Sequence, residues 1–484
     1  MMQRISYFVW VAFCIALMGV SSTFAQTNIT FNTIIMLDGT DCSSPEAILV
    51  QANDGNFYGT TRNGGAFGLG NIFQMTPAGT LTTLFSFIFT NDPDNNSYPY
   101  GTHPEAPLIQ GNDGNLYGTT QDGGTNGDGT VFCITTNGVL NYSVTLTKAE
   151  GANISAGLVQ GSDDNFYGVA INGGSGLGGG YKGTIFKMTP GGTVSNLFSF
   201  GPQIVPSSAG SYPNGSLVEG KDGDFYGATQ TGAHNGDGAI YKIDANGNFT
   251  PLYAFAGRGG QDPTGPFVLG NDGNFYGMTV SGGTYGLGTI FKVTTNGTLT
   301  YLVNFNGTNG ANENPIEYQP NYGPLVLATD GNFYGTTPSG GASNDGTIFM
   351  MTPSGTLTTL YSFIGGTNGA NPTGLIQAKD GNFFGTTTFT SEAGNGRGIG
   401  NGTIFRVSIP LQPVFQSMTQ TNGVFTFTWS AVATQTNQLQ YTSDLTSTNW
   451  TNCGDPFVAT NGTMSLSDIM GSNTQRFYRI VLLQ

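Results

Sequence analysis

The chain has few charged residues and few of the residues that favour long helices. Asp, Glu, Lys and Arg make up 9% of the 484 residues, whereas there are 77 glycines. Gly, Thr and Asn suit turns and strands, and long helices need Ala, Leu, Glu and Lys. Phe and Tyr recur at regular positions and can fill a core, which does not fit a disordered chain. We therefore expect an all-β protein with more than one domain.

Histidine is nearly absent, and this limits the catalytic chemistry. The two histidines, His103 and His234, lie in different repeat units and do not make a typical zinc triad. No Gly-x-Ser-x-Gly nucleophile elbow on a strand-to-helix turn is present. GSGLGGG from Gly174 resembles a phosphate loop only superficially, since it has no lysine and opens no helix. We assign no catalytic residue, no cofactor and no metal ligand.

Acidic side chains offer only weak candidate sites. Asp92, Asp94 and Asn96 have the spacing that opens a calcium loop, but Ser97 replaces the glycine that such a loop needs. A solvated acidic loop is the favoured interpretation. The other candidates are NGDG loops at Asn126 and Asn235, and carboxylate pairs that would suit a glycosidase if close, Glu313 with Glu317 or Asp92 with Glu105.

Cysteine and basic residues are also scarce. Outside the N-terminal apolar run the cysteines are Cys42, Cys133 and Cys453, an odd number that forbids complete pairing within the chain. We expect small, partly buried hydrophobic side chains, and a Cys42–Cys133 bond stays open. The net charge is −15, and it becomes −16 if Arg4 is removed with a signal peptide. No basic patch offsets phosphate charge, which disfavours nucleic acid and anionic lipid as partners.

A long apolar run occurs only at the N-terminus. Arg4 precedes the run from Phe8 to Val20, and small residues lead to Ala25. This is the pattern of a secretory signal, and the run is shorter than the roughly 20 residues of a membrane anchor, the rival interpretation. We expect residues 1–25 to be a signal peptide, cleavage after Ala25, and a secreted or cell-surface protein without a transmembrane segment after cleavage.

One phrase recurs seven times along the chain. DGNFYG or a close variant begins at Asp54, Asp113, Asp163, Asp222, Asp272, Asp330 and Asp380. The separations alternate between 58 or 59 and 50 residues. Periods of this size indicate a solenoid or a propeller.

Each unit divides into four strands. In the unit near Gly323 they are PLVLA, NFYGTT, GTIFMMT and TLTTLYSF. Asp-Gly predicts a two-residue hairpin between the first two strands, and Pro353-Ser-Gly predicts a second tight turn. The middle strands carry neighbouring apolar residues, so both sheet faces must be covered. Packing of blades against one another provides this cover, and no unit has helical periodicity.

The ends of the repeat region predict ring closure. The seventh unit stops after its third strand, at Pro410, and Ile29–Leu37 looks like a lone fourth strand. We expect the N-terminal strand to complete the last blade and remove a free edge. Residues 26–410 are therefore predicted to form a seven-bladed β-propeller with four-stranded blades.

The repeat motifs resemble a known family. DGNFYGTT, the Gly-Gly pairs such as Gly64–Gly65 and Gly123–Gly124, GTIF, and TPxGTLTTLYSF are similar to the GloVer tandem repeats of bacterial secreted proteins. The resemblance covers about residues 27–410. It implies export and a propeller-like array, and it implies no established activity.

After Leu411 the repeat disappears and the composition shifts toward Thr, Gln, Ser and Trp. Residues 411–484 alternate apolar and polar positions, as in VFTFTWSAV. This pattern predicts a small β-sandwich that resembles a fibronectin type III module. The aromatic residues expected in or near its core are Trp429, Tyr441, Trp450 and Tyr478.

The variable loops between blades are the predicted binding site. The long ones share one face of the ring and carry Tyr98, Tyr100, Tyr212, Tyr318 and Tyr322. Tyrosines among Asn, Asp and Glu can stack on sugar rings or meet a protein partner. The alternative is that they only pack their own loops.

Three functions stay open. The leading hypothesis is a non-enzymatic binding or scaffold protein with a glycan or protein ligand. The second is an enzyme similar to lyase and lactonase propellers, whose metal or His/Glu site has no match here. The third is a structural spacer at the cell surface. The sequence leaves the oligomeric state open.

Overall fold

The computed structural model describes residues 29–39, 42–90, 98–174, 182–201, 210–233, 236–311, 323–392, 398–409, 413, 415–421, 424–433, 435–444, 449–460, 462–469 and 476–483. The predicted signal peptide lies outside these ranges. Within them, every regular element is a β-strand apart from the short 3₁₀ turns Gly257–Gly259 and Gly366–Asn368. The all-β prediction is therefore confirmed. No helix in this part of the chain has the length and apolar character that crossing a membrane requires.

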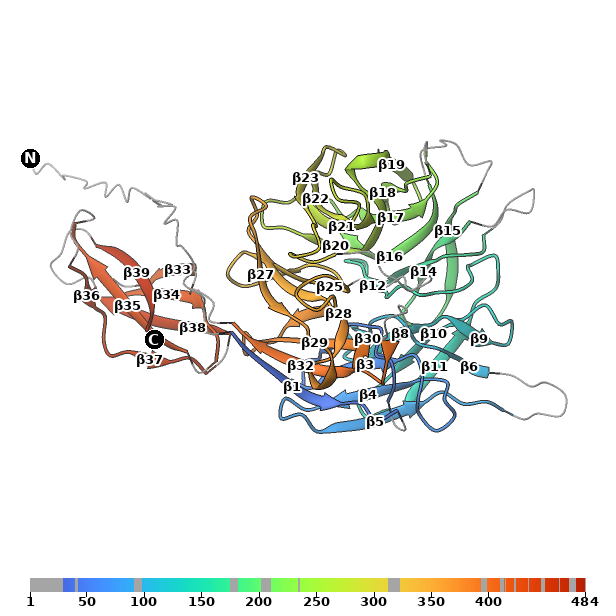
Figure 1. Ribbon diagram of the computed structural model, residues 1–484, viewed down its shortest axis with the longest axis horizontal. Helices are drawn as coiled ribbons and strands as arrows, with labels where there is room; N and C mark the ends of the chain where they lie inside the picture. Colours follow the sequence, from blue (N-terminus) through green and yellow to red (C-terminus); the bar gives the residue numbers. More distant parts are fainter. Residues whose placement is uncertain are drawn as a thin grey trace, which may run out of the picture.

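The described residues before Ile409 form seven four-stranded antiparallel sheets, which we number in chain order (Figure 1). Sheet 1 contains β2 (Val50–Gln51), β3 (Phe57–Thr61), β4 (Asn71–Met75) and β5 (Leu81–Ser86). Sheet 2 contains β7 (Ile109–Gln110), β8 (Leu116–Thr120), β10 (Thr130–Ile134) and β11 (Leu140–Thr145). Sheet 3 contains β12 (Val159–Gln160), β13 (Phe166–Ala170), β14 (Thr184–Met188) and β15 (Val194–Ser199). Sheet 4 contains β16 (Ser211–Glu219), β17 (Phe225–Thr231), β18 (Ala239–Ile243) and β19 (Phe249–Ala254).

The remaining sheets repeat the same order. Sheet 5 contains β20 (Gln261–Leu269), β21 (Phe275–Ser281), β22 (Thr289–Val293) and β23 (Leu299–Asn304). Sheet 6 contains β24 (Val326–Leu327), β25 (Phe333–Thr337), β26 (Thr347–Met351) and β27 (Leu357–Ser362). Sheet 7 contains β28 (Ala370–Gln377), β29 (Phe383–Phe389), β32 (Thr403–Ser408) and β1 (Thr30–Met36). Two short pairs join loops, β6 (Tyr98–Thr102) with β9 (Asp122–Gly124), and β30 (Ser391–Glu392) with β31 (Gly398–Ile399).

The turn at each repeated phrase is one residue longer than the sequence suggested. In sheet 1 the N–H of Ala52 donates to the carbonyl of Asn56, and the N–H of Gly55 donates to the carbonyl of Ala52. The connection therefore has three residues, and Gly55 takes the left-handed conformation at its end (φ +85°). A type I turn followed by a left-handed residue is a common three-residue hairpin loop. The expectation of a two-residue turn was wrong.

Aromatic rings join successive sheets. The tyrosine of one repeated phrase stacks on the phenylalanine of the next, as in Tyr117 with Phe166, whose ring centroids are 4.0 Å apart. The pairs of the other junctions are Tyr167–Phe225, Tyr226–Phe275, Tyr276–Phe333, Tyr334–Phe383 and Phe384–Phe57. The last pair joins sheet 7 to sheet 1. At the remaining junction Tyr58 shares a buried cluster with Leu116. The sheets are therefore packed against one another all the way round.

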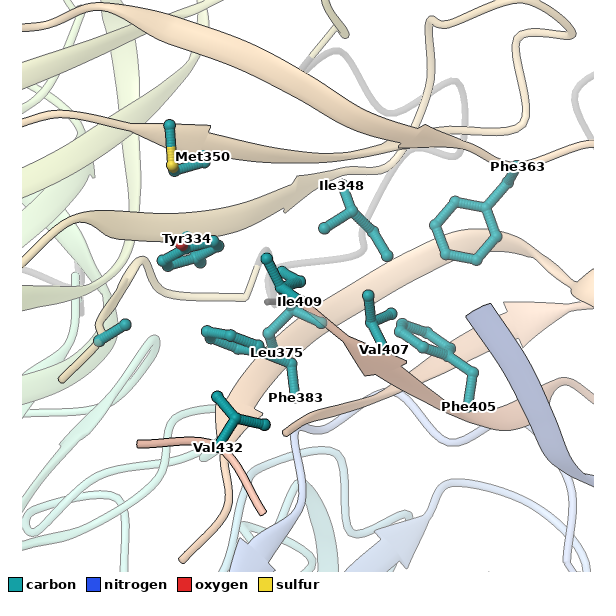
Figure 2. Packing of buried hydrophobic residues seen from close by; sticks show 11 residues of the cluster. Tyr334, Ile348, Met350, Phe363, Leu375, Phe383, Phe405, Val407, Ile409 and Val432 are labelled. Carbon is teal, nitrogen blue, oxygen red and sulfur yellow. The ribbon is translucent and has the colours of Figure 1, made fainter. Parts of the chain in front are cut away.

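The N-terminal strand makes the pairing that the sequence predicts. β1 runs antiparallel to β32, with Thr30 opposite Ser408 and Met36 opposite Thr403. Phe31 of β1 also stacks on Tyr361 of sheet 6, with centroids 4.2 Å apart. Figure 2 shows the buried cluster between sheets 6 and 7, which includes Val432.

The connections divide between two faces of the ring. Those between first and second, and between third and fourth strands, lie on one face, which we call the turn face. The connections between second and third strands and between sheets lie on the other, the loop face. Antiparallel pairing of consecutive strands requires this division.

The loop face has a repeated backbone latch. In six of the seven sheets, a residue with positive φ lies at the start of the first strand or in the loop before it, and its N–H donates to a carbonyl two residues before the third strand of the preceding sheet (2.7–3.1 Å). The residues are Ser44, His103, Asn153, Tyr212, Asp262 and Asn371. The bond of Ser44 to Asn401 links sheet 1 to sheet 7. A left-handed backbone conformation at a non-glycine residue costs free energy that the surrounding structure must offset. Because the conformation recurs at the same place in six sheets, we infer that it serves to link neighbouring sheets.

The C-terminal residues form two further sheets around one core. One contains β33 (Phe415–Thr421), β34 (Val424–Ser430) and β38 (Thr463–Ile469), and the other contains β35 (Thr436–Thr442), β36 (Thr451–Asn452), β37 (Phe457–Val458) and β39 (Phe477–Leu483). Trp429 is fully buried, and Tyr441 and Tyr478 pack against the same cluster. Trp450 is half-buried beneath the guanidinium of Arg479. Three of the four expected aromatics, Trp429, Tyr441 and Tyr478, are thus in or against this core, and Trp450 is not part of its cluster.

The C-terminal unit touches sheet 7. The N–H of Ala433 donates to the carbonyl of Asp380 (2.8 Å), and the N–H of Gly462 donates to the carbonyl of Lys379 (2.7 Å). All three cysteines in the described residues are buried, and none of them forms a disulfide bond. The interpretation of cysteine as a small buried side chain is confirmed, and the Cys42–Cys133 bond that the sequence left open is not formed.

Candidate functional site on the loop face

Exposed large apolar side chains gather on the loop face. Six such side chains are exposed among the described residues of the seven sheets and their connections. The loop face carries Met36, Phe67, Tyr98, Tyr285 and Ile364, and the turn face carries Val139. Exposed apolar groups concentrated on one side of a soluble protein indicate a place of contact with a ligand or partner.

Two of these side chains stand at equivalent positions in different repeats. Phe67 and Tyr285 each occupy the tip of a turn between second and third strands, and they are 56% and 62% exposed. The turns close with bonds from the N–H of Gly68 to Gly65 and of Gly286 to Gly283 (3.2 and 3.3 Å). A closed turn fixes the direction of the ring, so these aromatics project from rigid supports.

The tyrosines predicted to bind a ligand differ in exposure and in their place in the fold. Tyr98 begins β6, is 38% exposed, and packs on Phe89 with centroids 5.3 Å apart. Tyr100 packs instead into the buried cluster between sheets 1 and 2. Tyr212 is a half-buried latch residue at the start of sheet 4. Tyr98 and Tyr100 therefore share one strand, while Tyr212 lies two sheets away. Tyr318 and Tyr322 lie outside the described residues.

A polar pair lies next to β6. Nδ1 of His103 is 3.5 Å from Oδ2 of Asp122, and the amide of Asn153 donates to the other carboxylate oxygen of Asp122 (3.1 Å). Both His103 and Asp122 are partly exposed. The carboxylate is held from sheet 2 and from the latch of sheet 3, and it keeps lone pairs for further hydrogen bonds.

Two buried carboxylates share one arginine beside this pair. Nε of Arg62 lies 2.6 Å from Oε1 of Glu105 and 3.9 Å from Oε2 of Glu46. Burial and the neighbouring carboxylate of Glu46 raise the pKa of Glu105 to about 8, although Arg62 acts in the opposite direction. The cluster joins sheets 1 and 2, because Arg62 follows β3 and Glu105 precedes β7.

Sequence reasoning missed the true partner of Glu105. It paired Glu105 with Asp92, which lies outside the described residues, whereas the neighbour in the structure is Glu46. The available signal was the shared tripeptide Pro-Glu-Ala, which precedes the first strand in both units at Glu46 and Glu105. Equivalent positions in neighbouring repeats come together when the units pack side by side.

Other weak candidates fall outside the part of the chain that the structure describes. They are the loop of Asp92, Asp94 and Asn96, the pair Glu313 and Glu317, His234, Asn235, and most of GSGLGGG after Gly174. Asn126 is an exposed residue of a turn whose amide donates to the carbonyl of Leu146 (3.1 Å). Across the described ranges, no three His, Cys, Asp or Glu side chains are grouped to hold a metal ion.

Several solved structures are similar to this chain. A fungal alcohol oxidase in complex with copper is 14% identical, with 93% of this chain and 92% of that chain covered and a TM-score of 0.48. A Dyadobacter fermentans protein of unknown function is 12% identical, with coverage of 79% and 99% and a TM-score of 0.42. The Pseudomonas aeruginosa periplasmic gluconolactonase is 17% identical, with coverage of 66% and 84% and a TM-score of 0.43. Likenesses this distant carry no argument about activity.

No curated protein matches the sequence. The Gloeobacter/Verrucomicrobia repeat family, in contrast, matches in three overlapping stretches, residues 18–219, 176–396 and 221–457. Together these stretches include all seven repeated phrases. The chain therefore belongs to the Gloeobacter/Verrucomicrobia repeat family.

Proposed function

We propose that this protein is an exported, non-enzymatic binding or scaffold protein whose loop face takes a glycan or protein ligand. In this proposal residues 1–25 are a cleaved signal peptide and residues 26–410 are a seven-bladed β-propeller. Residues 411–484 are a β-sandwich that resembles a fibronectin type III module. The protein is secreted or held at the cell surface.

The distribution of exposed apolar side chains carries the proposal. Five of the six that belong to the ring of sheets lie on the loop face. Water-exposed aromatics such as Phe67 and Tyr285 have an unfavourable hydration cost that contact with a ligand removes. The turn face instead presents short connections of nearly uniform sequence, which suit a scaffold.

The test compares variants of the two faces. The mature protein, residues 26–484, is assayed on a glycan array and in pull-down experiments with cell-surface proteins. We expect a specific ligand whose binding is lost in the triple variant F67A/Y98A/Y285A and retained in the turn-face control V139A. If no ligand binds, or if V139A and the triple variant behave alike, the loop face is not a binding site.

A second candidate is an extracellular propeller enzyme that acts on polysaccharide or a lactone. The favouring observation is that the pair His103–Asp122 lies beside Glu105, whose pKa is raised into the range of a general acid at neutral pH. Metal analysis of the purified protein and activity screens for lyase, hydrolase and lactonase turnover separate the two. Turnover that is lost in E105Q and H103A would replace the binding proposal.

A further inference from the structure

The junction of sheets 1 and 2 joins two exposed aromatics through a polar pair. Phe67 stands two residues before Leu69, whose carbonyl accepts the N–H of His103 (3.0 Å). The ring of His103 faces Asp122, which begins β9. Beside it, a Cβ placed on Gly123 would lie 3.0 Å from the Cβ of Tyr98. We call Phe67, Tyr98, His103 and Asp122 the junction patch.

The junction patch is held in place before any ligand arrives. Its tip turn is closed by glycine, and His103 is fixed by the latch. The carboxylate of Asp122 is restrained on both sides by His103 and Asn153. Tyr98 is held by the pairing of β6 with β9 (Figure 1) and by packing on Phe89. Binding to a rigid surface loses less conformational entropy, so few contacts are enough for affinity.

The chemistry of the junction patch matches a saccharide. A pyranose ring has apolar C–H faces that pack on aromatic rings and hydroxyls at its rim. Phe67 and Tyr98 supply two separate aromatic surfaces. Between them, the carboxylate of Asp122 accepts hydrogen bonds from hydroxyls, and the imidazole of His103 donates or accepts. A purely apolar partner surface would leave these two polar groups without water or a new partner.

The charge around the junction patch selects among saccharides. Asp122 supplies the carboxylate of the patch, Arg62 beside it is already paired with Glu105 and Glu46, and the whole chain has a net charge of −15. Uronate or sulfate groups would be repelled at such a surface. From these observations we infer that the junction patch is a subsite for a neutral polysaccharide chain. This inference rests on the proposed function and specifies its ligand.

Affinity electrophoresis tests the inference on the mature protein, residues 26–484. Native gels are cast with glucomannan, xylan or a β-1,3-glucan, and a gel with alginate provides the anionic comparison. We expect retardation in at least one neutral gel and none with alginate. F67A and Y98A should each weaken the apparent affinity at least tenfold. V139A is the control, because Val139 is exposed on the turn face and lies outside the proposed binding surface, and it should bind as the unmodified chain does.

Thermal unfolding of each variant checks that the fold is retained. We expect unchanged unfolding temperatures, because the side chains of Phe67 and Tyr98 are exposed. The inference is overturned if no neutral polysaccharide retards the protein, if alginate does, or if F67A and Y98A bind as tightly as V139A. A protein ligand that is captured on the loop face without any polysaccharide binding would overturn this inference and leave the proposed function standing. Absence of every ligand would overturn both.

Discussion

The aspartate of the repeated phrase anchors a small network as well as a turn. In sheet 1, Asp54 accepts hydrogen bonds from the N–H and the amide of Asn56 and from the hydroxyl of Tyr58. Burial alone would raise the pKa of Asp54, but these hydrogen bonds outweigh it and lower the pKa. The letters D, N and Y of the phrase are thus explained by contacts within one unit.

Removing one tyrosine hydroxyl tests this network. The hydroxyl of Tyr117 donates to Asp113 at 2.8 Å. We expect Tyr117→Phe to lower the free energy of unfolding by about 1 kcal/mol, the usual contribution of such a bond. Urea unfolding gives the value, and Tyr285→Phe, at an exposed tip, is the control. An unchanged midpoint for Tyr117→Phe would show that the bond adds nothing to stability.

The glycine of the phrase makes room for a phenylalanine on the next strand. Gly168 lies opposite Phe186 in the pairing of β13 with β14, and an added Cβ would lie 2.4 Å from that ring. Either the ring of Phe186 or the strand that carries residue 168 would have to shift. The sequence predicted both strands, but this contact depends on their register, which the repeat alone does not specify.

The substitution Gly168→Ala measures how tightly this contact is packed. Overpacking a filled core typically costs about 1–3 kcal/mol, so we expect a loss of unfolding free energy in that range. Gly191→Ala is the control, because the nearest atom to its added Cβ is 3.9 Å away. Equal stability of the two variants in denaturant titrations would contradict the packing argument.

At the scale of elements, four strands per unit and their covered faces were predictable, because apolar neighbours on the middle strands require contact on both sides. The pairing of β6 with β9 was not predictable, since it joins two loops, with Tyr98 opposite Gly124 and Thr102 opposite Asp122. Tyr100 was predicted to lie in a binding loop, although it packs against the buried cluster between sheets 1 and 2. Three of the five tyrosines of the predicted site are described by the structure, and of these three only Tyr98 is exposed. Short loop strands have too few residues to show a period of two.

Pairs formed between units were the least accessible to sequence reasoning. Glu46 and Glu105 are separated by a whole repeat, and their proximity follows only from the packing of sheet 1 on sheet 2. Their shared contact with Arg62 joins the two sheets by charge as well as by apolar packing. We therefore expect the stability of the junction between sheets 1 and 2 to depend on pH in a way that a single repeat would not show.

Stability should fall with rising pH because of Glu105. Its pKa is raised from 4.5 to about 8 in the folded protein. The folded state therefore holds a proton that the unfolded state releases, and the contribution is full below pH 4.5 and is lost as pH rises through about 8. The steepest loss is about 1.4 kcal/mol per pH unit for one group.

Chemical unfolding at pH 5 and pH 8.5 measures this contribution. We expect Glu105→Gln, which cannot ionise, to have a smaller difference between its unfolding free energies at pH 5 and pH 8.5 than the unmodified chain has. Asp455→Asn, at an exposed carboxylate of the C-terminal unit, should leave the difference unchanged. A steep pH dependence that persists in Glu105→Gln would assign it to other groups.

At the scale of the whole molecule, several kinds of contact close the ring of sheets at the junction between sheet 7 and sheet 1. Sheet 7 meets sheet 1 through the stacking of Phe384 on Phe57, through the latch of Ser44, and through the N–H of Lys379, which donates to the side chain of Gln51 (2.8 Å). β1 adds a strand from the other end of the chain. The missing fourth strand of the last repeat made this pairing predictable, because an unpaired edge is a liability.

Closure by β1 can be tested by supplying the strand separately. A protein that begins at Leu37 lacks β1 and exposes the side of Tyr361 and Phe405 on which Phe31 stacks. We expect a lower unfolding temperature for this protein, and recovery when a synthetic peptide of residues 27–38 is added. At a peptide concentration of 100 times its dissociation constant, binding restores about 2.7 kcal/mol.

A scrambled peptide of the same composition is the control, and differential scanning calorimetry is the measurement. The register from Thr30 opposite Ser408 to Met36 opposite Thr403 requires the native order of apolar residues, so the scrambled peptide should give no recovery. If the truncated protein unfolds at the same temperature as the full chain, the other contacts between sheets 7 and 1 suffice. β1 would then be an appended strand, and the closure of the ring would rest on the stacked aromatics and the latches.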